Sequence, residues 1–199
     1  MQKQTKPEQN RQRLLDAGVE LFSEHGFHGI GLKELLSTVN IPKGSFYNYF
    51  NSKEDFGVQV AEYYTEQFTG LLDATLGNTR VDGLTALKQF FRTAIQLFRD
   101  KEFRHGCLLG NFGAEISDTS EVCRRSVACA MNHLAGKFRD AIVRGQQDGG
   151  IRSDIKPKAL ADVLLNGWEG ALLRMKMEHS GKPLENFRNV MINQLLSPQ

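Results

Sequence analysis

The residues with the most suggestive chemistry lie between Ile41 and Lys53, in the stretch Ile-Pro-Lys-Gly-Ser-Phe-Tyr-Asn-Tyr-Phe-Asn-Ser-Lys. Its hydroxyl, amide and ammonium groups are of the kinds that hydrogen-bond phosphate oxygens and the edges of DNA bases. Pro42 fixes φ and lacks an N–H group, which suits the first turn of a helix. We therefore expect a helix from about Lys43 to Phe50.

This expected helix has an apolar side and a polar side. Phe46 and Phe50 are four residues apart and therefore share one side. The opposite side carries Gly44, Ser45 and Asn48. A glycine lets the backbone approach a partner closely, and an asparagine can form two hydrogen bonds with adenine, so this side suits a DNA groove. A small buried core helix is the alternative, but it would leave the polar side without a use.

Groups that can reach DNA phosphates are expected around the polar side. Lys43 begins the helix, Tyr47 and Tyr49 lie on its two shoulders, and backbone N–H groups point out of its first turn. The complete set of candidate DNA contacts consists of small, polar and cationic residues: Gly31, Lys33, Lys43, Gly44, Ser45, Tyr47, Asn48, Tyr49 and Lys53.

Two further helices are expected before the aromatic one. The first spans about residues 8–25 and is followed by Gly26, which suits a helix end. The second spans about Leu32 to Val39, where apolar residues recur at helical spacing. Residues 40–42 then form the turn into the aromatic helix. Two short helices joined by about three residues make a helix-turn-helix.

The remainder of the chain is also predicted to be helical, because its apolar residues recur every three or four positions without a strand pattern. We expect helices over about 53–76, 83–100, 107–116, 120–148, 157–180 and 183–196, nine in all. Ser52 and Asp82 are expected to cap the first two of these helices. The predicted architecture is an all-α fold. Residues 1–52 would form a DNA-binding domain with a disordered arm at 1–7, and residues 53–199 a helical sensor and dimerisation domain.

The composition is that of an ordinary globular protein, with 40% hydrophobic and 24% charged residues. No apolar run reaches the roughly 18 residues that a membrane span needs, and the polar N-terminus does not resemble a signal peptide. We therefore expect a cytoplasmic protein without a membrane partner. The formal net charge of +2 supports nucleic-acid binding only weakly.

Signatures of catalysis and of metal binding are missing from the sequence. It contains no GxSxG, HExxH, GxGxxG or Walker loop, so we do not expect an enzyme. The three cysteines are an odd number, which argues against a disulfide framework. None belongs to a CxxC or CxxH pair, so we expect neither a structural zinc site nor a cofactor.

The aromatic helix and its surroundings resemble the recognition segment of the TetR family of transcriptional repressors. The residues that stand at the positions of that family's motif are Lys43-Gly44, Tyr47, Tyr49-Phe50 and Ser52-Lys53-Glu54. The resemblance extends upstream to about Arg11 and implies that this helix enters the major groove of operator DNA. One departure is Gly31, where the family usually has a Thr or Ser whose hydroxyl caps the helix and often contacts a phosphate.

The last two helices are candidates for a dimer interface. Small and apolar residues give them stripes at helical spacing: Leu160, Leu164, Gly167, Ala171, Phe187 and Met191. Periodicity alone fits an intramolecular core equally well, but TetR-family repressors dimerise through their last two helices, so the resemblance implies a homodimer. Repressors of this kind commonly enclose a ligand in the helical body. Candidates for its lining are aromatic: Phe68, Phe98, Phe112 and Trp168.

Cys107 is the candidate sensor residue. It lies at an expected helix start, after Lys101 and Arg104, and both a helix N-terminus and nearby cations favour the thiolate that attacks electrophiles and oxidants. An inert buried cysteine is the alternative. The strings Gly106-Cys107-Leu108 and Ala114-Glu115 are similar to the NemR-like branch of the TetR family, whose members sense electrophiles and reactive chlorine through a cysteine in this place. Acrylate-type repressors are similar here too, so a small unsaturated ligand stays open.

The sequence therefore favours a homodimeric repressor that binds a pseudo-palindromic operator. An electrophile, an oxidant or a small apolar ligand acting on the helical body would release it. Two alternatives stay open: a helical protein–protein interaction module that does not bind DNA, and a repressor whose ligand binds without covalent reaction. Salt-dependent DNA binding would distinguish a repressor from an interaction module.

Overall fold

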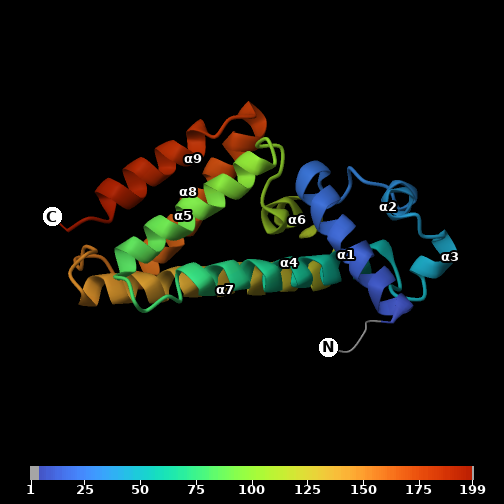
Figure 1. Ribbon diagram of the computed structural model, residues 1–199, viewed down its shortest axis with the longest axis horizontal. Coiled ribbons are helices and arrows are strands. Elements are labelled where there is room, and N and C mark those ends of the chain that lie inside the picture. Colours follow the sequence, from blue (N-terminus) through green and yellow to red (C-terminus); the bar gives the residue numbers. More distant parts are fainter. Residues whose placement is uncertain (1–4, 199) are drawn as a thin grey trace. The chain divides into compact units, whose positions relative to one another are not determined.

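The computed structural model describes residues 5–198, and every regular element in that range is a helix (Figure 1). The elements are α1 (Lys6–His25), α2 (Leu32–Val39), α3 (Lys43–Phe46), α4 (Lys53–Thr75), α5 (Gly83–Asp100), α6 (Leu108–Ile116), α7 (Glu121–Gln147), α8 (Pro157–Glu178), α9 (Lys182–Phe187) and η1 (Arg188–Leu195). The predicted all-α fold is confirmed. Within residues 5–198, no helix is both long and apolar enough to cross a lipid bilayer.

The chain forms two compact units that are not two contiguous stretches. Unit 1 comprises the residues up to Glu66 together with Leu108–Cys129, and unit 2 comprises Gln67–Cys107 together with the residues from Ala130 onward. Helix α6 therefore belongs to the same compact unit as the predicted helix-turn-helix. The predicted boundary after residue 52 divides the chain by function, into a DNA-binding domain and a sensor and dimerisation domain, whereas these units divide it by compactness. That boundary stays a prediction.

The expected helix caps explain several element boundaries. Asp55 N–H donates to the Ser52 hydroxyl at 3.0 Å, and Thr85 N–H donates to the Asp82 carboxylate at 2.7 Å, so both predicted caps are confirmed. Helix α1 begins at Lys6, earlier than expected, because the Glu8 carboxylate accepts the Thr5 N–H at 2.7 Å. Residues 6 and 7 of the expected arm are thus helical, and residues 1–4 lie outside the described range.

Two predicted helices have a different backbone from the one expected. Helix α3 ends at Phe46 instead of Phe50, because the N–H groups of Asn48 and Tyr49 donate to carbonyls three residues back and form tight turns. The last helix is regular α-helix only in α9. It continues as the π-helix η1 up to Leu195, and the Leu196 N–H donates to the Met191 carbonyl at 3.0 Å.

Phenylalanine rings fill the centre of unit 1 and hold the helix-turn-helix together. Phe56 of α4 lies in the middle, with ring centroids 5.8 Å from Phe22, 5.5 Å from Phe46 and 4.7 Å from Phe50. All four of these side chains are at most 2% exposed, so truncating Phe56 to alanine would cost about 3–5 kcal/mol. The apolar side predicted for the recognition segment is therefore used to pack it against α1 and α4.

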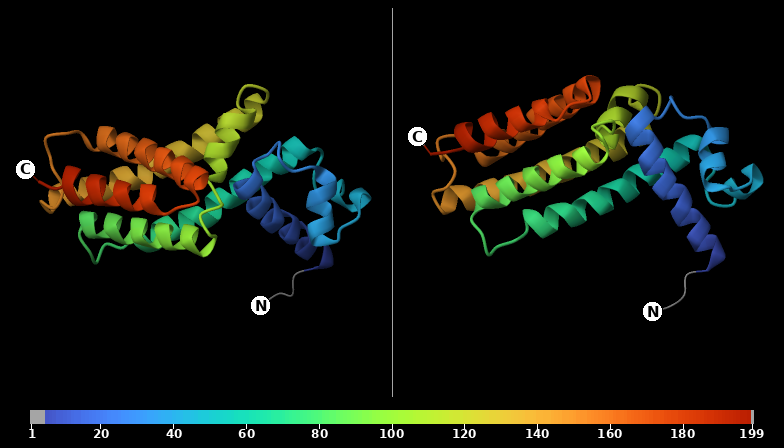
Figure 2. Two further views of the ribbon diagram at one scale, coloured as in Figure 1. Left: turned by 90° about the horizontal axis from the view of Figure 1, so that it is seen from above. Right: turned by 45° about the horizontal axis from the view of Figure 1, so that its top comes forward.

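A second aromatic cluster forms the core of unit 2, where α5, α8 and the α9–η1 segment lie alongside one another (Figure 2). Phe91 of α5 is its centre, with ring centroids 4.9 Å from Trp168 and 5.5 Å from Phe187. Phe90 and Phe138 close the other side of the cluster. This cluster fixes the position of α8, which carries the residues discussed below.

Candidate DNA-binding surface and candidate sensor site

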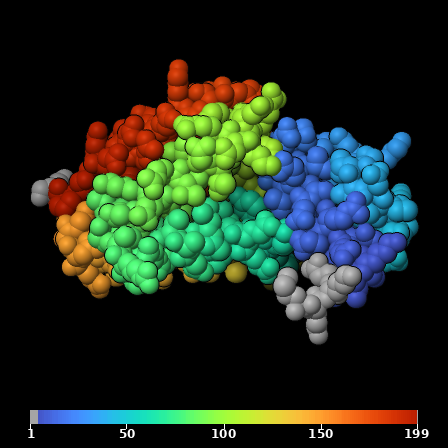
Figure 3. Space-filling model, viewed as in Figure 1, coloured from blue at the N-terminus to red at the C-terminus, as the bar shows by residue number. Residues whose placement is uncertain are grey.

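Helices α2 and α3 border an open groove on unit 1. Its lining consists of Lys33, Leu36, Ser37, Asn40, Ile41, Pro42 and Lys43. Asn40 ends α2 in a left-handed conformation (φ 52°), which turns the chain sharply toward α3. Figure 3 shows the α2–α3 segment, in lighter blue, at the surface of unit 1. The lining includes two lysines and no acidic residue, so the groove is basic.

Most of the predicted DNA contacts are exposed, and two of them, Lys33 and Lys43, line this groove. The exposed ones are Gly31, Lys33, Lys43, Gly44, Tyr47 and Asn48, which we call the recognition surface. Tyr47 is 52% exposed, and its ring stands edge-on against buried Phe46 with centroids 5.4 Å apart. Ser45 and Tyr49 are half-buried. The structure thus leaves six of the nine candidates accessible.

The two glycines of the recognition surface are not required by the fold. A Cβ atom placed on Gly44 or on Gly31 would meet no other atom within 4 Å. Gly18 of α1 is the opposite case, since a Cβ there would lie 2.6 Å from Val60 and 2.7 Å from Phe56. The free space at Gly44 leaves room for close approach of a partner from outside the protein.

Lys53 is engaged inside unit 1. Its ammonium group donates to the Phe27 carbonyl at 2.6 Å and lies 4.3 Å from the centroid of the Phe27 ring. Burial lowers the pKa of Lys53, with Glu54 and Glu115 acting in the opposite direction. The lysine therefore fastens the start of α4 to the turn after α1, although the sequence pattern placed it among the DNA contacts.

Contacts between α6 and the end of α1 were not predicted from the sequence. The Asn111 amide donates to the carbonyls of Phe22 and Ser23 at 3.0 and 3.2 Å. The Glu115 carboxylate accepts the backbone N–H of His28 at 2.8 Å. These partners are 87–89 residues apart, so no local pattern could have indicated them. They anchor α6 to the turn that leads into the helix-turn-helix.

Cys107 lies in unit 2, immediately before α6, and is 8% exposed. Glu169 of α8 belongs to the same unit. Burial raises the pKa of Glu169 to about 7, and the hydrogen bond from Cys107 acts in the opposite direction. Arg104, expected to favour the thiolate, lies 3.5 Å from Glu102 in an ion pair.

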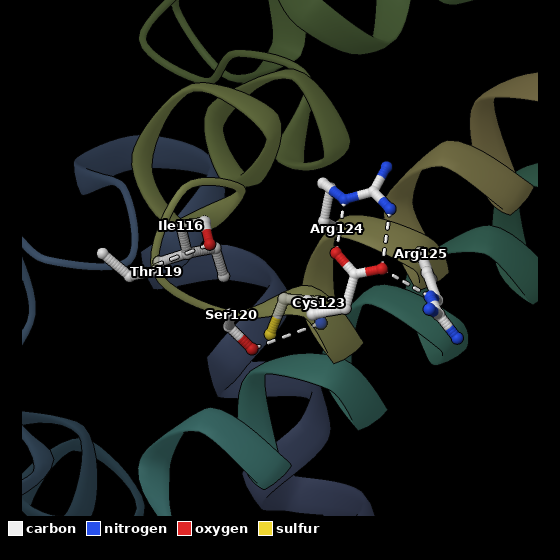
Figure 4. Close-up of polar contacts among 7 residues, drawn as sticks. Ile116, Thr119, Ser120, Cys123, Arg124 and Arg125 are labelled. Atoms are coloured by element: carbon white, nitrogen blue, oxygen red, sulfur yellow. Dashed lines mark hydrogen bonds and ion pairs between the residues drawn. The ribbon is translucent and has the colours of Figure 1, made fainter.

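The other two cysteines have different surroundings. Cys123 is 2% exposed in the first turn of α7, and its N–H donates to the Ser120 hydroxyl at 3.3 Å (Figure 4). The neighbouring Arg124 and Arg125 both bind the Glu121 carboxylate, which lowers the pKa of Glu121 to about 2. Cys129 is exposed. None of these three cysteines forms a disulfide, and they differ in accessibility and in their polar neighbours.

Several residues of the predicted dimer interface are already buried within one chain. Leu160, Leu164, Ala171 and Phe187 are at most 9% exposed, and Gly167 and Met191 are half-buried. The same helices present other apolar side chains to solvent: Val163, Leu173, Met177, Val190 and Leu195. A shallow hollow between α8 and the α9–η1 segment includes Gly167, Gly170 and Met191 in its lining. The surface available to a partner is therefore broader than the predicted stripe.

The aromatic residues suggested as pocket lining are divided between the two units. Phe112 belongs to unit 1, where its ring lies 5.6 Å from Phe22. In unit 2, the rings of Phe98 and Trp168 lie 6.3 Å apart, while Phe68 contacts Phe90 at 5.9 Å. Each of the four rings has aromatic neighbours of its own, as core residues do.

Comparisons with known proteins give the same picture over most of the chain. Residues 14–58 match the family model described as bacterial regulatory proteins, tetR family, and residues 83–191 match the one described as tetracyclin repressor-like, C-terminal domain. The chain is 36% identical over 186 residues to the HTH-type transcriptional repressor DhaR of Mycobacterium sp. (strain GP1), covering 94% of this chain and 92% of that one.

A second relative is known in three dimensions. The HTH-type transcriptional repressor NemR of Escherichia coli (strain K12) is 36% identical over 180 residues, covering 88% of each chain. The crystal structure of the reduced form of E. coli NemR superimposes with a TM-score of 0.84 at 32% identity, covering 93% of this chain and 96% of that one. The similarity therefore includes both the helix-turn-helix and the helical body.

Proposed function

Because this chain belongs to the TetR family of DNA-binding transcriptional repressors, we propose that it binds a pseudo-palindromic operator as a homodimer and leaves it when Cys107 is modified. The modifying agent is a small electrophile or oxidant. The family establishes a repressor rather than an enzyme or a protein-binding module. Dimerisation, operator symmetry and the releasing signal are the proposed parts.

The recognition surface supports the operator-binding part of the proposal. Asn48 supplies an exposed amide for reading a base edge, while Lys43 and Tyr47 supply exposed donors for phosphates. A symmetric dimer of such units reads two half-sites about 34–36 Å apart, or a multiple of that spacing, which is why the operator should be a pseudo-palindrome. The observation that carries this part is the open α2–α3 groove, whose lining includes Lys33 and Lys43.

The exposed apolar residues of α8 and η1 support dimerisation. Val163, Met177 and Val190 are 53%, 73% and 40% exposed. Exposed apolar side chains along two adjacent elements are typical of a protein–protein contact surface. Gly170 faces open space, since a Cβ there would meet nothing within 4 Å. Small residues between exposed apolar ones let a second helix pair approach closely. Light scattering of the purified protein should give the mass of a dimer.

The position of Cys107 supports its role in release. The first segment of unit 2 ends at Cys107, and the next residue begins α6, which Asn111 and Glu115 anchor to the turn before α2. A group added to a nearly buried thiol must displace close-packed neighbours. Displacement at the start of α6 would pass directly to the residues that hold the helix-turn-helix. The similar crystal structure of E. coli NemR is of its reduced form, and the signals proposed for this chain likewise include oxidants.

The test compares single cysteine variants bound to operator DNA. An unsaturated aldehyde or a quinone should release the wild-type protein and should leave Cys107→Ser bound. Cys123→Ser and Cys129→Ser, which retain Cys107, serve as controls and should be released like the wild type. Equal release of Cys107→Ser would remove the covalent mechanism and would favour a ligand held without reaction, the second candidate.

A further inference from the structure

Arg11, in the first half of α1, is an exposed cation that contacts two other parts of unit 1. Its guanidinium group donates to the side-chain carbonyl of Gln59 at 2.6 Å and lies 5.8 Å from the centroid of the Phe50 ring. Gln59 belongs to α4, and Phe50 is a 2% exposed residue at the end of the recognition segment, residues 43–50. The arginine therefore covers the end of that segment while it is bonded to α4.

The Gln59 side chain has a second partner. Its NH2 group donates to one oxygen of the Asp55 carboxylate at 3.1 Å, one turn earlier in α4. The other Asp55 oxygen accepts the backbone N–H of Asn51 at 2.8 Å and the Asn51 side-chain amide at 3.1 Å. A glutamine suits the middle position, because its amide is an acceptor on one side and a donor on the other. We call this hydrogen-bonded series the relay; it consists of Arg11, Gln59, Asp55 and Asn51.

The Asp55 carboxylate holds the last step of the relay firmly. The Asn51 N–H and the Gln59 amide lower the pKa of Asp55, while burial acts in the opposite direction. The side chain is therefore ionised at neutral pH, and hydrogen bonds to an ionised acceptor are stronger than those between neutral groups. Its place in the first turn of α4 is also favourable for a negative charge.

The recognition segment requires such a fastening because its regular helix ends early. Helix α3 ends at Phe46, and the N–H of Asn48 donates to the carbonyl three residues back at 3.2 Å. Tight turns of this kind have poorer hydrogen-bond geometry than an α-helix. Asn48 therefore lies between two fixed points, the buried Phe46 ring before it and Phe50 with Asn51 after it. A shift at the second point would turn the exposed Asn48 amide away from a base edge.

We propose that Arg11 is a positioning residue for DNA recognition, which acts through the relay on the end of the recognition segment rather than by contacting a phosphate. The inference rests on the proposed operator contacts of the recognition surface, since it concerns how those contacts are held in place. Exposed arginines of DNA-binding proteins commonly contact the DNA backbone. The unbroken series of hydrogen bonds from Arg11 to Asn51 is the observation that carries the different role.

The two roles of Arg11 predict different couplings to Gln59. An arginine that contacts a phosphate contributes independently of the uncharged glutamine, so the losses from replacing the two residues would add. An arginine that acts through the relay contributes little once Gln59 has been replaced. Because Gln59→Leu leaves the net charge unchanged, it should weaken binding to the operator without weakening the electrostatic binding to unrelated DNA.

The experiment is a double-mutant cycle in operator binding, measured by fluorescence anisotropy on the full-length protein at one salt concentration. Arg11→Met should weaken binding roughly tenfold in the wild-type background, on the order of the loss of one hydrogen bond from a charged group. In the Gln59→Leu background the same replacement should weaken binding by no more than about twofold. Gln59→Leu alone should lose a similar factor on the operator and nothing on an unrelated duplex of equal length.

Tyr63→Phe supplies the matched control background. The Tyr63 hydroxyl donates to the Asp16 carboxylate at 2.7 Å and so joins the same two helices, α1 and α4, further from the recognition segment. Removing this hydroxyl leaves the relay intact. Arg11→Met should therefore weaken operator binding by the full factor of roughly ten in Tyr63→Phe, as it does in the wild type.

Gln59→Glu separates positioning from a simple link between α1 and α4. The new carboxylate can still accept from Arg11, but it cannot donate to Asp55, so the relay is broken at its second step. The relay predicts that this variant loses preference for the operator over unrelated DNA, although the contact to Arg11 is retained. A simple link between the two helices predicts that the preference is unchanged.

The outcomes separate this inference from the proposed function. Equal effects of Arg11→Met in the wild type and in Gln59→Leu would overturn the relay and assign Arg11 to a phosphate. If Gln59→Leu does not fold, Gln59→Glu serves as the second background with the same expected result. Unchanged operator preference of Asn48→Ala would instead overturn the proposed base contact, and the cycle would still decide whether Arg11 acts through Gln59.

Discussion

Replacing Gly44 by alanine should weaken DNA binding while leaving the folded protein as stable as before, or more so. The added methyl group meets nothing within 4 Å in the free protein. Alanine also has less conformational entropy than glycine in the unfolded chain. The substitution should therefore stabilise the folded protein by up to about 1 kcal/mol. For a chain of this length, that corresponds to a rise in Tm of roughly 2–4 °C.

The expected loss of affinity comes from the close approach that Gly44 allows. A methyl group forced into a packed interface costs about 1–3 kcal/mol, which corresponds to a dissociation constant larger by roughly 5- to 150-fold. The assay is fluorescence anisotropy of a labelled operator at one fixed salt concentration, paired with thermal unfolding of the same samples.

Two glycines serve as matched controls for this prediction. Gly70 of α4 also has nothing within 4 Å of a Cβ, so Gly70→Ala should be stable and should bind DNA normally. Gly18→Ala should instead lose stability, because its methyl group would meet Val60 and Phe56. Normal operator affinity of Gly44→Ala would refute the reasoning, since it would mean that DNA does not approach this part of α3.

Three further predictions concern other parts of the molecule. Gly170→Glu should yield monomers by light scattering, while Gly136→Glu, at an equally open position of α7, should remain dimeric. Lys43→Ala should weaken binding to all operators and lower the salt slope by about 1, whereas Asn48→Ala should change which sequences are preferred in a binding-site selection. Because the pKa of Glu121 is lowered to about 2, its contribution to stability is present above its ordinary value of 4.5 and is lost as the pH falls toward 2. Acid unfolding of Glu121→Gln, followed by circular dichroism, should lack that component, and an unchanged acid transition would exclude it.

The parts of the fold that were predicted well are those with local signals. Helices α2 and α5 have the expected bounds, because apolar spacing and the caps at Gly31 and Asp82 act within a single turn. The early end of α3 was missed. Its polar side and phenylalanine spacing fit a longer helix, whereas the actual turns depend on how Phe46 and Phe50 pack around Phe56.

In the candidate sites, too, the residues with local signals were predicted and the long-range contacts were not. The exposed members of the recognition surface follow from helical spacing within one short segment. The local contact of Lys53 was not predicted, because its partner is the Phe27 carbonyl, 26 residues earlier. The raised pKa of Glu169 could not be predicted from the sequence, because it follows from burial and α8 carries no motif that marks one glutamate. Long-range packing decides which groups meet, and it leaves little trace in a local pattern.

The most direct test of the proposed function measures modification and DNA binding on the same sample. Wild-type protein bound to its operator would be titrated with an unsaturated aldehyde, with the fraction of Cys107 modified read by mass spectrometry and the fraction bound read by anisotropy. The proposal predicts that the two fractions are complementary throughout the titration, and that Cys107→Ser stays bound at every dose. Wild-type protein that stays on the operator with Cys107 fully modified would contradict it.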